Sequence, residues 1–172
     1  MAKTTFTGPV ISKNGFTNTG PDMTVSLTAD TTLTVATHAG RILLCNDADG
    51  KFTLPSINVN ANAASAGDND VNNLNNIGAT FLFYVETAAT DMDILTDGTD
   101  KFKGGIEIGT DDGADKAFFP AGSNDVITMN GTTKGGIVGS VLSITAIDTA
   151  SYLVHNCLLL GSGTIVTPYA DS

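Results

Sequence analysis

Residues 27–55 read LTADTTLTVATHAGRILLCNDADGKFTLP. Two apolar, threonine-rich runs are followed by the turn sequence Asp-Ala-Asp-Gly at 47–50 and by a short run, Lys-Phe-Thr-Leu-Pro, at 51–55. Side chains of a strand alternate between the two faces of a sheet, and Asp, Asn and Gly tolerate the positive φ that tight turns require. The stretch is therefore typical of a half-buried antiparallel sheet.

The same pattern continues to the C-terminus, and no window has a convincing helical period. At most a short helical turn is expected within 61–75. The inward-facing side chains of the first strands are expected to be Val25, Leu27, Leu33, Val35, Ile42 and Leu44. Strands are predicted at 23–27, 31–36, 40–46, 51–54, 79–86, 92–95, 102–108, 116–119, 125–129, 135–147 and 151–160, with a short tail at 163–166.

The last two long strands are predicted to form one hairpin about residues 148–150. Glycines at 135, 136 and 139 predict a bulge or a sharp bend in its first strand. The side chains expected to pack across this hairpin are Val141, Ile144, Tyr152 and Val154.

The length of 172 residues fits one domain, which would bury about 70% of its unfolded surface. We expect an all-β fold, a jelly-roll-like antiparallel β-sandwich over 23–172, preceded by an extended N-terminal arm over 1–22. The arm has Gly, Pro or Asn every few residues, and its sizeable apolar side chains are Val10, Ile11 and Phe16. These anchors favour an arm that lies across a neighbouring molecule and becomes ordered there, with a frayed tail as the alternative. A polar, Asn-rich loop at 58–78 is expected to decorate one end of the sheets.

The net charge is −10, and of the 18 acidic residues only Glu86 and Glu107 are glutamate. Asp favours turns over helix interiors, so this composition indicates a protein with little helix. The negative electrostatic field disfavours binding to the phosphate backbone of a nucleic acid. Neither a signal peptide nor an apolar run long enough to span a membrane is visible, so synthesis in a reducing cytoplasm is expected. Cys45 and Cys157 lie in apolar runs and are interpreted as free thiols in strands, with a single disulfide between them as the alternative.

Residue types that carry catalysis do not cluster. The two histidines, His38 and His155, stand alone, whereas metal sites on jelly-roll scaffolds use several histidines with a carboxylate. His38 is expected to cap a turn and His155 to lie on an outer sheet face. Ser140 lacks the G-x-S-x-G context of a nucleophile, and residues 161–163 are interpreted as a flexible turn. We expect no catalytic residues, no metal site and no cofactor.

Calcium is the alternative that the Asp-rich segments raise. Residues 68–72 match the first ligand positions of an EF-hand loop, but Asn73 replaces its glycine and Ala79 its bidentate glutamate. Other Asp-rich turns are explained by hydrogen bonds within the turn, with a metal-bridged subunit contact as the alternative. These turns are at 91–93, 97–100 and 111–115.

Residues 1–16, MAKTTFTGPVISKNGF, resemble the start of small structural proteins of tailed bacteriophages, especially marine and cyanobacterial ones. Residues 27–55 are similar to the same class, with a Leu-Thr-Ala strand, a Gly-flanked strand and a Thr-Leu-Pro strand end. The closing segments, Gly-Gly at 135–136, Tyr-Leu-Val at 152–154, Gly-Ser-Gly-Thr at 161–164 and Thr-Pro-Tyr at 167–169, also resemble it.

The resemblance implies a virion structural protein, and within that class a capsid decoration, or cement, protein on the outside of the head. Such proteins are β-rich, are often homotrimers and clamp major capsid protein subunits. Val10, Ile11 and Phe16 would contact the capsid or a sister subunit. The alternative is a surface adhesin or carbohydrate-binding module of head, neck or tail, for which Tyr84, Tyr152 and Tyr169 are candidate aromatic platforms. A metal-dependent jelly-roll enzyme is the third interpretation.

Overall fold

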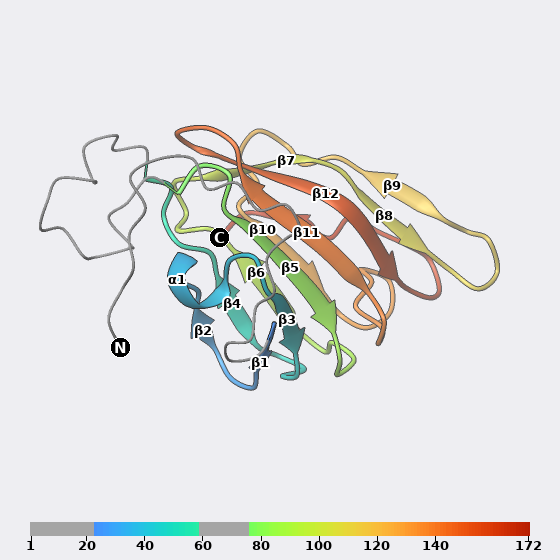
Figure 1. Ribbon diagram of the computed structural model, residues 1–172. Coiled ribbons are helices and arrows are strands. Elements are labelled where there is room, and N and C mark those ends of the chain that lie inside the picture. The colour runs from blue at the N-terminus through green and yellow to red at the C-terminus, as the bar shows by residue number, and fades with distance from the viewer. Residues whose placement is uncertain (1–22, 59–75) are drawn as a thin grey trace, which may run out of the picture.

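The computed structural model describes residues 23–58 and 76–172, and in this part of the chain nearly all regular structure is β (Figure 1). The large sheet contains, in spatial order, β1 (Thr24–Leu27), β3 (Ile42–Cys45), β5 (Thr80–Val85), β11 (Val141–Ala146), β12 (Ser151–Leu160), β8 (Ile106–Gly109) and β9 (Lys116–Phe118), and β7 (Lys101–Gly104) also pairs with β12. The small sheet contains β13 (Tyr169–Ala170), β10 (Val126–Met129), β6 (Met92–Leu95), β4 (Lys51–Thr53) and β2 (Thr31–Thr32).

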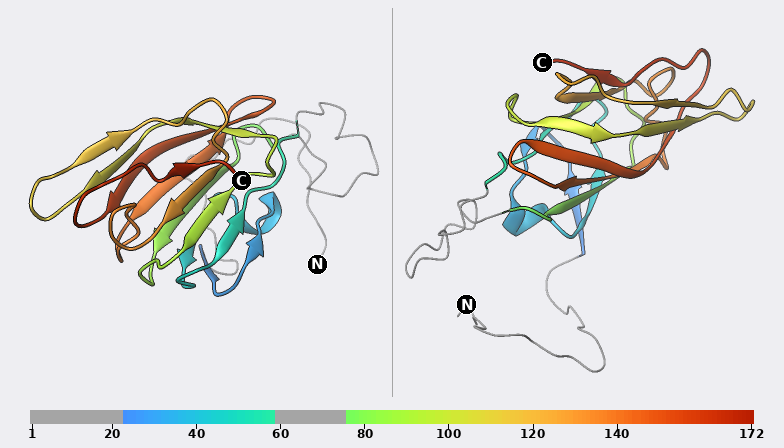
Figure 2. Two further views of the ribbon diagram at one scale, coloured as in Figure 1. Left: turned by 180° about the vertical axis from the view of Figure 1, so that it is seen from behind. Right: turned by 90° about the horizontal axis from the view of Figure 1, so that it is seen from above.

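The two sheets face each other across one apolar core. The large sheet lies in front in Figure 1, and the small sheet lies in front when the molecule is seen from behind (Figure 2). Both sheets contribute fully buried phenylalanines, among them Phe52 from β4 and Phe83 from β5. The all-β prediction is confirmed, with a core built largely from Phe, Leu, Ile and Met.

The prediction of antiparallel sheets is wrong for much of the fold. Both sheets are mixed, because β1–β3, β3–β5, β12–β7, β12–β8, β2–β4 and β4–β6 pair in parallel. The pairs β5–β11, β11–β12, β8–β9, β6–β10 and β10–β13 are antiparallel. The strand order of an antiparallel jelly roll is therefore not present among the described strands.

Four of the six parallel pairs arise because the first six strands alternate between the sheets. β1, β3 and β5 lie in the large sheet, and β2, β4 and β6 lie in the small sheet. The turn at 47–50 therefore carries the chain from one sheet to the other and does not close a hairpin. A turn of a few residues fits either arrangement, so turn residues alone do not reveal it.

The inward side of β3 is also opposite to the prediction. Leu43 and Cys45 are fully buried, whereas Ile42 is 38% exposed and Leu44 is half-buried on the outer face. The run Ile-Leu-Leu-Cys is apolar at every position, so its sequence pattern does not reveal which alternate side chains face the core. Pairing with β1 and β5 decides it instead. Leu27 and Leu33 are buried as expected.

Several predicted strands are shorter than expected. After β2 the chain forms the short helix α1 (Val35–His38), with Thr34 as its N-cap. The segment 102–108 is divided into β7 and β8 at Gly104, whose φ is 89°. The segment 135–140 is a sharp bend, as its glycines predict, and the strand begins only at Val141. The C-terminal strand is β13, not 163–166.

The predicted hairpin of β11 and β12 is confirmed, and it contains a bulge in its second strand. Val141 pairs with Leu158 and Ser143 with His155, so one residue of β11 lies opposite two of β12. Asn156 occupies the bulge with φ 46°, a value that Asn tolerates better than most residues. The bulge moves the inward positions of β12 from even-numbered to odd-numbered residues.

Three predictions fall outside the described residues. These are the arm over 1–22 with Val10, Ile11 and Phe16, the helical turn within 61–75, and the EF-hand-like residues 68–72. Most of the loop at 58–78 falls there too.

Candidate interaction surface

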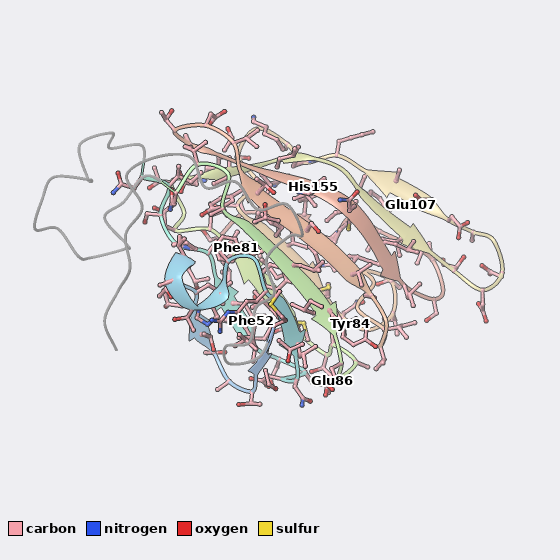
Figure 3. The ribbon with its side chains drawn as sticks, viewed as in Figure 1. Phe52, Phe81, Tyr84, Glu86, Glu107 and His155 are labelled. Carbon is pink, nitrogen blue, oxygen red and sulfur yellow. The ribbon has the colours of Figure 1, made fainter. Side chains whose placement is uncertain are left out.

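The outer face of the large sheet is the surface that differs most from the rest of this acidic protein. Five of its eight strands lie side by side and contain no Asp, Glu, Lys or Arg, namely β1, β3, β5, β11 and β12. Charged residues begin only beyond β12, with Lys103 on β7 opposite Leu153 and Glu107 on β8 opposite Leu158. Figure 3 labels Tyr84, His155 and Glu107 along this face. Depletion of charge is typical of the centre of a protein–protein interface.

Apolar side chains form one row across four strands of this face, in which strand register aligns Leu44, Tyr84, Val141 and Leu158. The neighbouring row is apolar at Ile42 and Leu82 and then continues with Ser143 and His155. Ile42 and Leu158 are 38% and 44% exposed, and the other apolar members are half-buried. The outward apolar residues of the large sheet are Ile42, Leu44, Leu82, Tyr84, Val141, Leu153, Leu158 and Leu160.

The outer face of the small sheet has a different composition. It carries Thr32, Thr53 and Thr128 together with the charged pair of neighbours Lys51 and Asp93. A solvated sheet face is normally polar in this way, whereas a contiguous apolar patch marks an interaction site. The large sheet therefore presents the candidate interaction surface.

A hydrogen-bonded chain of polar side chains crosses three strands of this face. The Nδ2 group of Asn156 lies 3.1 Å from Nδ1 of His155, and Nε2 of His155 lies 2.8 Å from Oγ1 of Thr145. Oγ1 of Thr145 lies 2.8 Å from Oγ1 of Thr80. An acceptor role for Nδ1 assigns the proton of neutral His155 to Nε2, which then donates to Thr145. The outward position of His155 agrees with the sequence prediction.

A depression of about 320 Å³ lies next to these hydrogen-bonded side chains, on the outer face between β3 and β12. It combines apolar walls with Arg41, the only arginine of the sequence. We call it the Arg41 depression, and it is lined by Met23, Gly40, Arg41, Ile42, Thr80, Leu82, Ser143, His155 and Asn156. Sequence reasoning missed both Arg41 and Ser143 as site residues. The available signals were the uniqueness of Arg41 and the absence of charge from the strands around it.

A second groove, of about 490 Å³, lies where β12 meets β8. Leu158, Leu160 and Ile137 form its apolar part, and Asp111 and Asp115 line it as well. It extends the apolar outer face towards the edge of the large sheet.

His38 is the last residue of α1, whose caps are Thr34 and Ala39, so it does not cap a turn as predicted but folds back on the first turn of the helix. Its side chain is buried, and the backbone N–H of Thr34 donates to its Nδ1 at 2.9 Å. Burial lowers the pKa of His38, and the positive charge of Arg41 lowers it further. The folded protein therefore favours neutral His38.

We expect this preference to make stability depend on pH. The unfolded chain takes up a proton at His38 near pH 6.5, whereas the folded protein resists it, so the free energy of unfolding falls as the pH drops below about 6.5. The variant His38→Asn keeps an acceptor for Thr34 but cannot titrate. Melting temperatures between pH 7.5 and 5 should therefore fall more steeply for the wild type than for His38→Asn. Parallel curves would contradict the prediction, since His155 and the carboxylates are common to both proteins.

Two of the three Asp-rich segments, 97–100 and 111–115, use carboxylates within the turn as predicted, whereas Met92 and Asp93 of the segment 91–93 belong to β6. Asp97 Oδ1 accepts from the backbone N–H groups of Thr99 and Asp100 at 2.9 and 3.0 Å. Asp112 Oδ1 accepts from the N–H of Ala114 at 3.1 Å. Across residues 23–58 and 76–172, no three His, Cys, Asp or Glu residues are grouped to hold a metal ion.

The remaining candidate residues have structural surroundings. Ser140 is fully buried, donating to the carbonyl of Ile137 and accepting from the N–H of Leu160. Cys45 and Cys157 are free thiols on strands separated by β5 and β11, and burial raises the pKa of both to about 12.

The three tyrosines differ in how much surface they offer to a ligand. Tyr152 is fully buried with its hydroxyl donating to the carbonyl of Pro55, and Tyr169 is 6% exposed. Tyr84 alone of the three lies on the outer face, where it is half-buried. Of the three candidate tyrosines, only Tyr84 could therefore serve as a carbohydrate platform.

Comparison with protein-family models, curated proteins and solved structures found no match to this chain. In the part of the chain that the structure describes, no helix has the length and apolar character needed to cross a membrane.

Proposed function

We propose that this protein is a virion structural protein that acts by docking, and specifically a capsid decoration protein on the outside of an assembled head. The observation that carries the proposal is the absence of charged residues from the five adjacent strands β1, β3, β5, β11 and β12 of the large sheet, together with the apolar side chains on their outer face. The protein has a net charge of −10, yet five adjacent strands carry no charged residue. Such a local depletion of charge is typical of a surface that binds a partner. The resemblance of residues 1–16 and 27–55 to tailed-phage structural proteins supplies the class of partner.

The mechanism is preferential binding to the assembled shell. A protein that binds neighbouring major capsid protein subunits together, but not the free subunit, stabilises the shell by mass action. The stiffness of two packed sheets suits this role, because little conformational entropy is lost on docking. A homotrimer would place three copies of the outer face around a symmetry axis. Val10, Ile11 and Phe16 are proposed as a second contact, to the capsid or to a sister subunit.

The location of the protein in purified phage particles tests the proposal. Gold-labelled antibodies against this protein should decorate the head surface, and particle reconstruction should show additional density on the outside of the shell. Label on the neck, tail or fibres would instead support the surface adhesin, which a glycan array would then examine. Particles that contain none of this protein would overturn both proposals.

A further inference from the structure

The Arg41 depression holds two donor groups that the protein does not use itself. Arg41 is half-buried and makes no ion pair or hydrogen bond with the described residues. Ser143 is only 7% exposed, and its hydroxyl likewise has no hydrogen-bond partner there. This hydroxyl is not a fully buried atom, so it is open to the depression that Ser143 lines.

Strand register directs Ser143 into the depression. Its neighbours Leu142 and Ile144 are fully buried on the inner face, so Ser143 lies on the outer face. There it is opposite Leu82 on one side and His155 on the other.

His155 forms a fixed wall of the depression and leaves the donor role to the other two groups. Both of its ring nitrogens are occupied, by Asn156 and by Thr145. Arg41 therefore supplies a positive fork of N–H donors and Ser143 a neutral O–H donor. Neither group has a carboxylate among its described neighbours in the depression, although the chain contains 18 acidic residues.

We propose that the Arg41 depression binds a carboxylate side chain, an Asp or Glu carried on the surface of the partner protein. The guanidinium matches a carboxylate in a bidentate geometry, and the Ser143 hydroxyl donates to one of its oxygens. Ile42, Leu82 and Met23 contribute apolar wall, which suits an acidic residue flanked by apolar surface and not a free, fully hydrated anion. Arginine in an apolar surround is also typical of the residues that dominate interface energies. The inference rests on the proposed docking function and names the chemistry of the partner.

Titration by NMR of the full-length protein tests this site directly. Because Arg41 is the only arginine, its Nε–Hε group gives one signal that needs no assignment. The probe is N-acetyl-leucyl-aspartyl amide, and the matched control is N-acetyl-leucyl-asparaginyl amide, which differs only in lacking the charge. We expect the aspartyl peptide to shift the Arg41 signal and the backbone amides of Ser143 and His155 in a saturable way, with the asparaginyl peptide at least about tenfold weaker.

Two variants show whether the shift comes from this site. Arg41→Gln should weaken binding at least about tenfold, as read from the Ser143 and His155 amides, and Arg41→Lys should recover part of it, because it restores the charge without the fork. Ser143→Ala should weaken binding while leaving the melting temperature unchanged, because the hydroxyl has no partner to lose. Equal shifts with both peptides, no saturable shift, or full binding by Arg41→Gln would overturn the proposal.

A negative result in the titration and a negative result in the particle experiment contradict different proposals. Peptide binding without any place in the virion would leave the carboxylate site standing and overturn the capsid role. A place on the head without peptide binding would leave docking standing and overturn the carboxylate site.

Discussion

The variant Gly104→Ala is expected to lose most of the stability of the protein. Gly104 ends β7 with φ 89°, and a Cβ at this position would lie 2.1 Å from the carbonyl oxygen of Val154 and 3.1 Å from Cδ1 of Leu153. The obstacle is the backbone of the paired strand β12, which cannot turn aside as a side chain can. The pairing of β7 with β12 must therefore open. We expect a loss of about 4 kcal/mol or more in the free energy of unfolding, a size that only a few mechanisms reach.

The matched control for this variant is Gly113→Ala. Gly113 has a similar φ of 74°, in the turn between β8 and β9, but no atom lies within 4 Å of the added Cβ. This variant should cost only the backbone strain of an alanine at positive φ, about 1–2 kcal/mol. Urea denaturation of both variants gives the comparison. Equal losses would mean that the close approach of β7 to β12 contributes nothing, contrary to this expectation.

The variant Leu82→Glu is expected to abolish docking while leaving the fold intact. Leu82 lies in the middle of the outer face, between Ile42 and Ser143 in the strand register. In the free protein a glutamate there can reach water, so the stability should change by less than about 1 kcal/mol. In the docked state the carboxylate would be desolvated against an apolar partner and would lie beside the proposed acidic residue. We expect binding to weaken by about 30-fold or more, the loss typical of a central interface residue.

Thr53→Glu controls for a general effect of added charge. Thr53 lies on the outer face of the small sheet, beside Leu95 and Thr32, and is half-buried like Leu82. It should bind as the wild type does. Co-sedimentation of each protein with phage heads provides the measurement, and melting curves check folding. If the Thr53→Glu variant failed to bind phage heads while the Leu82→Glu variant still bound them, the docking face would be the outer face of the small sheet.

Local sequence signals accounted for the chemical character of the fold. Alternating runs and Asp-rich turns predicted strands and few helices, and the turn carboxylates of Asp97 and Asp112 bond as expected. The β11–β12 hairpin was also predicted. These features depend on neighbours in sequence, and for that reason they can be read from it.

Features that depend on distant neighbours could not be predicted. Ile42 and Leu44 lie in a run without alternation, so only pairing with β1 and β5 assigned them to the outer face. The bulge at Asn156 reverses the phase of β12, and no local pattern marks it. The Arg41 depression joins residues from β3, β5, β11 and β12, whose meeting depends on strand order.

The sequence by itself determined that this chain builds strands with little helix and that most of its Asp residues belong to turns and loops. The tertiary structure alone decided that successive strands alternate between two sheets, and that the five uncharged strands are adjacent and form one apolar face. The physical reason is that periodicity reports which side chains share a face, whereas hydrogen bonding between remote strands determines which faces become neighbours.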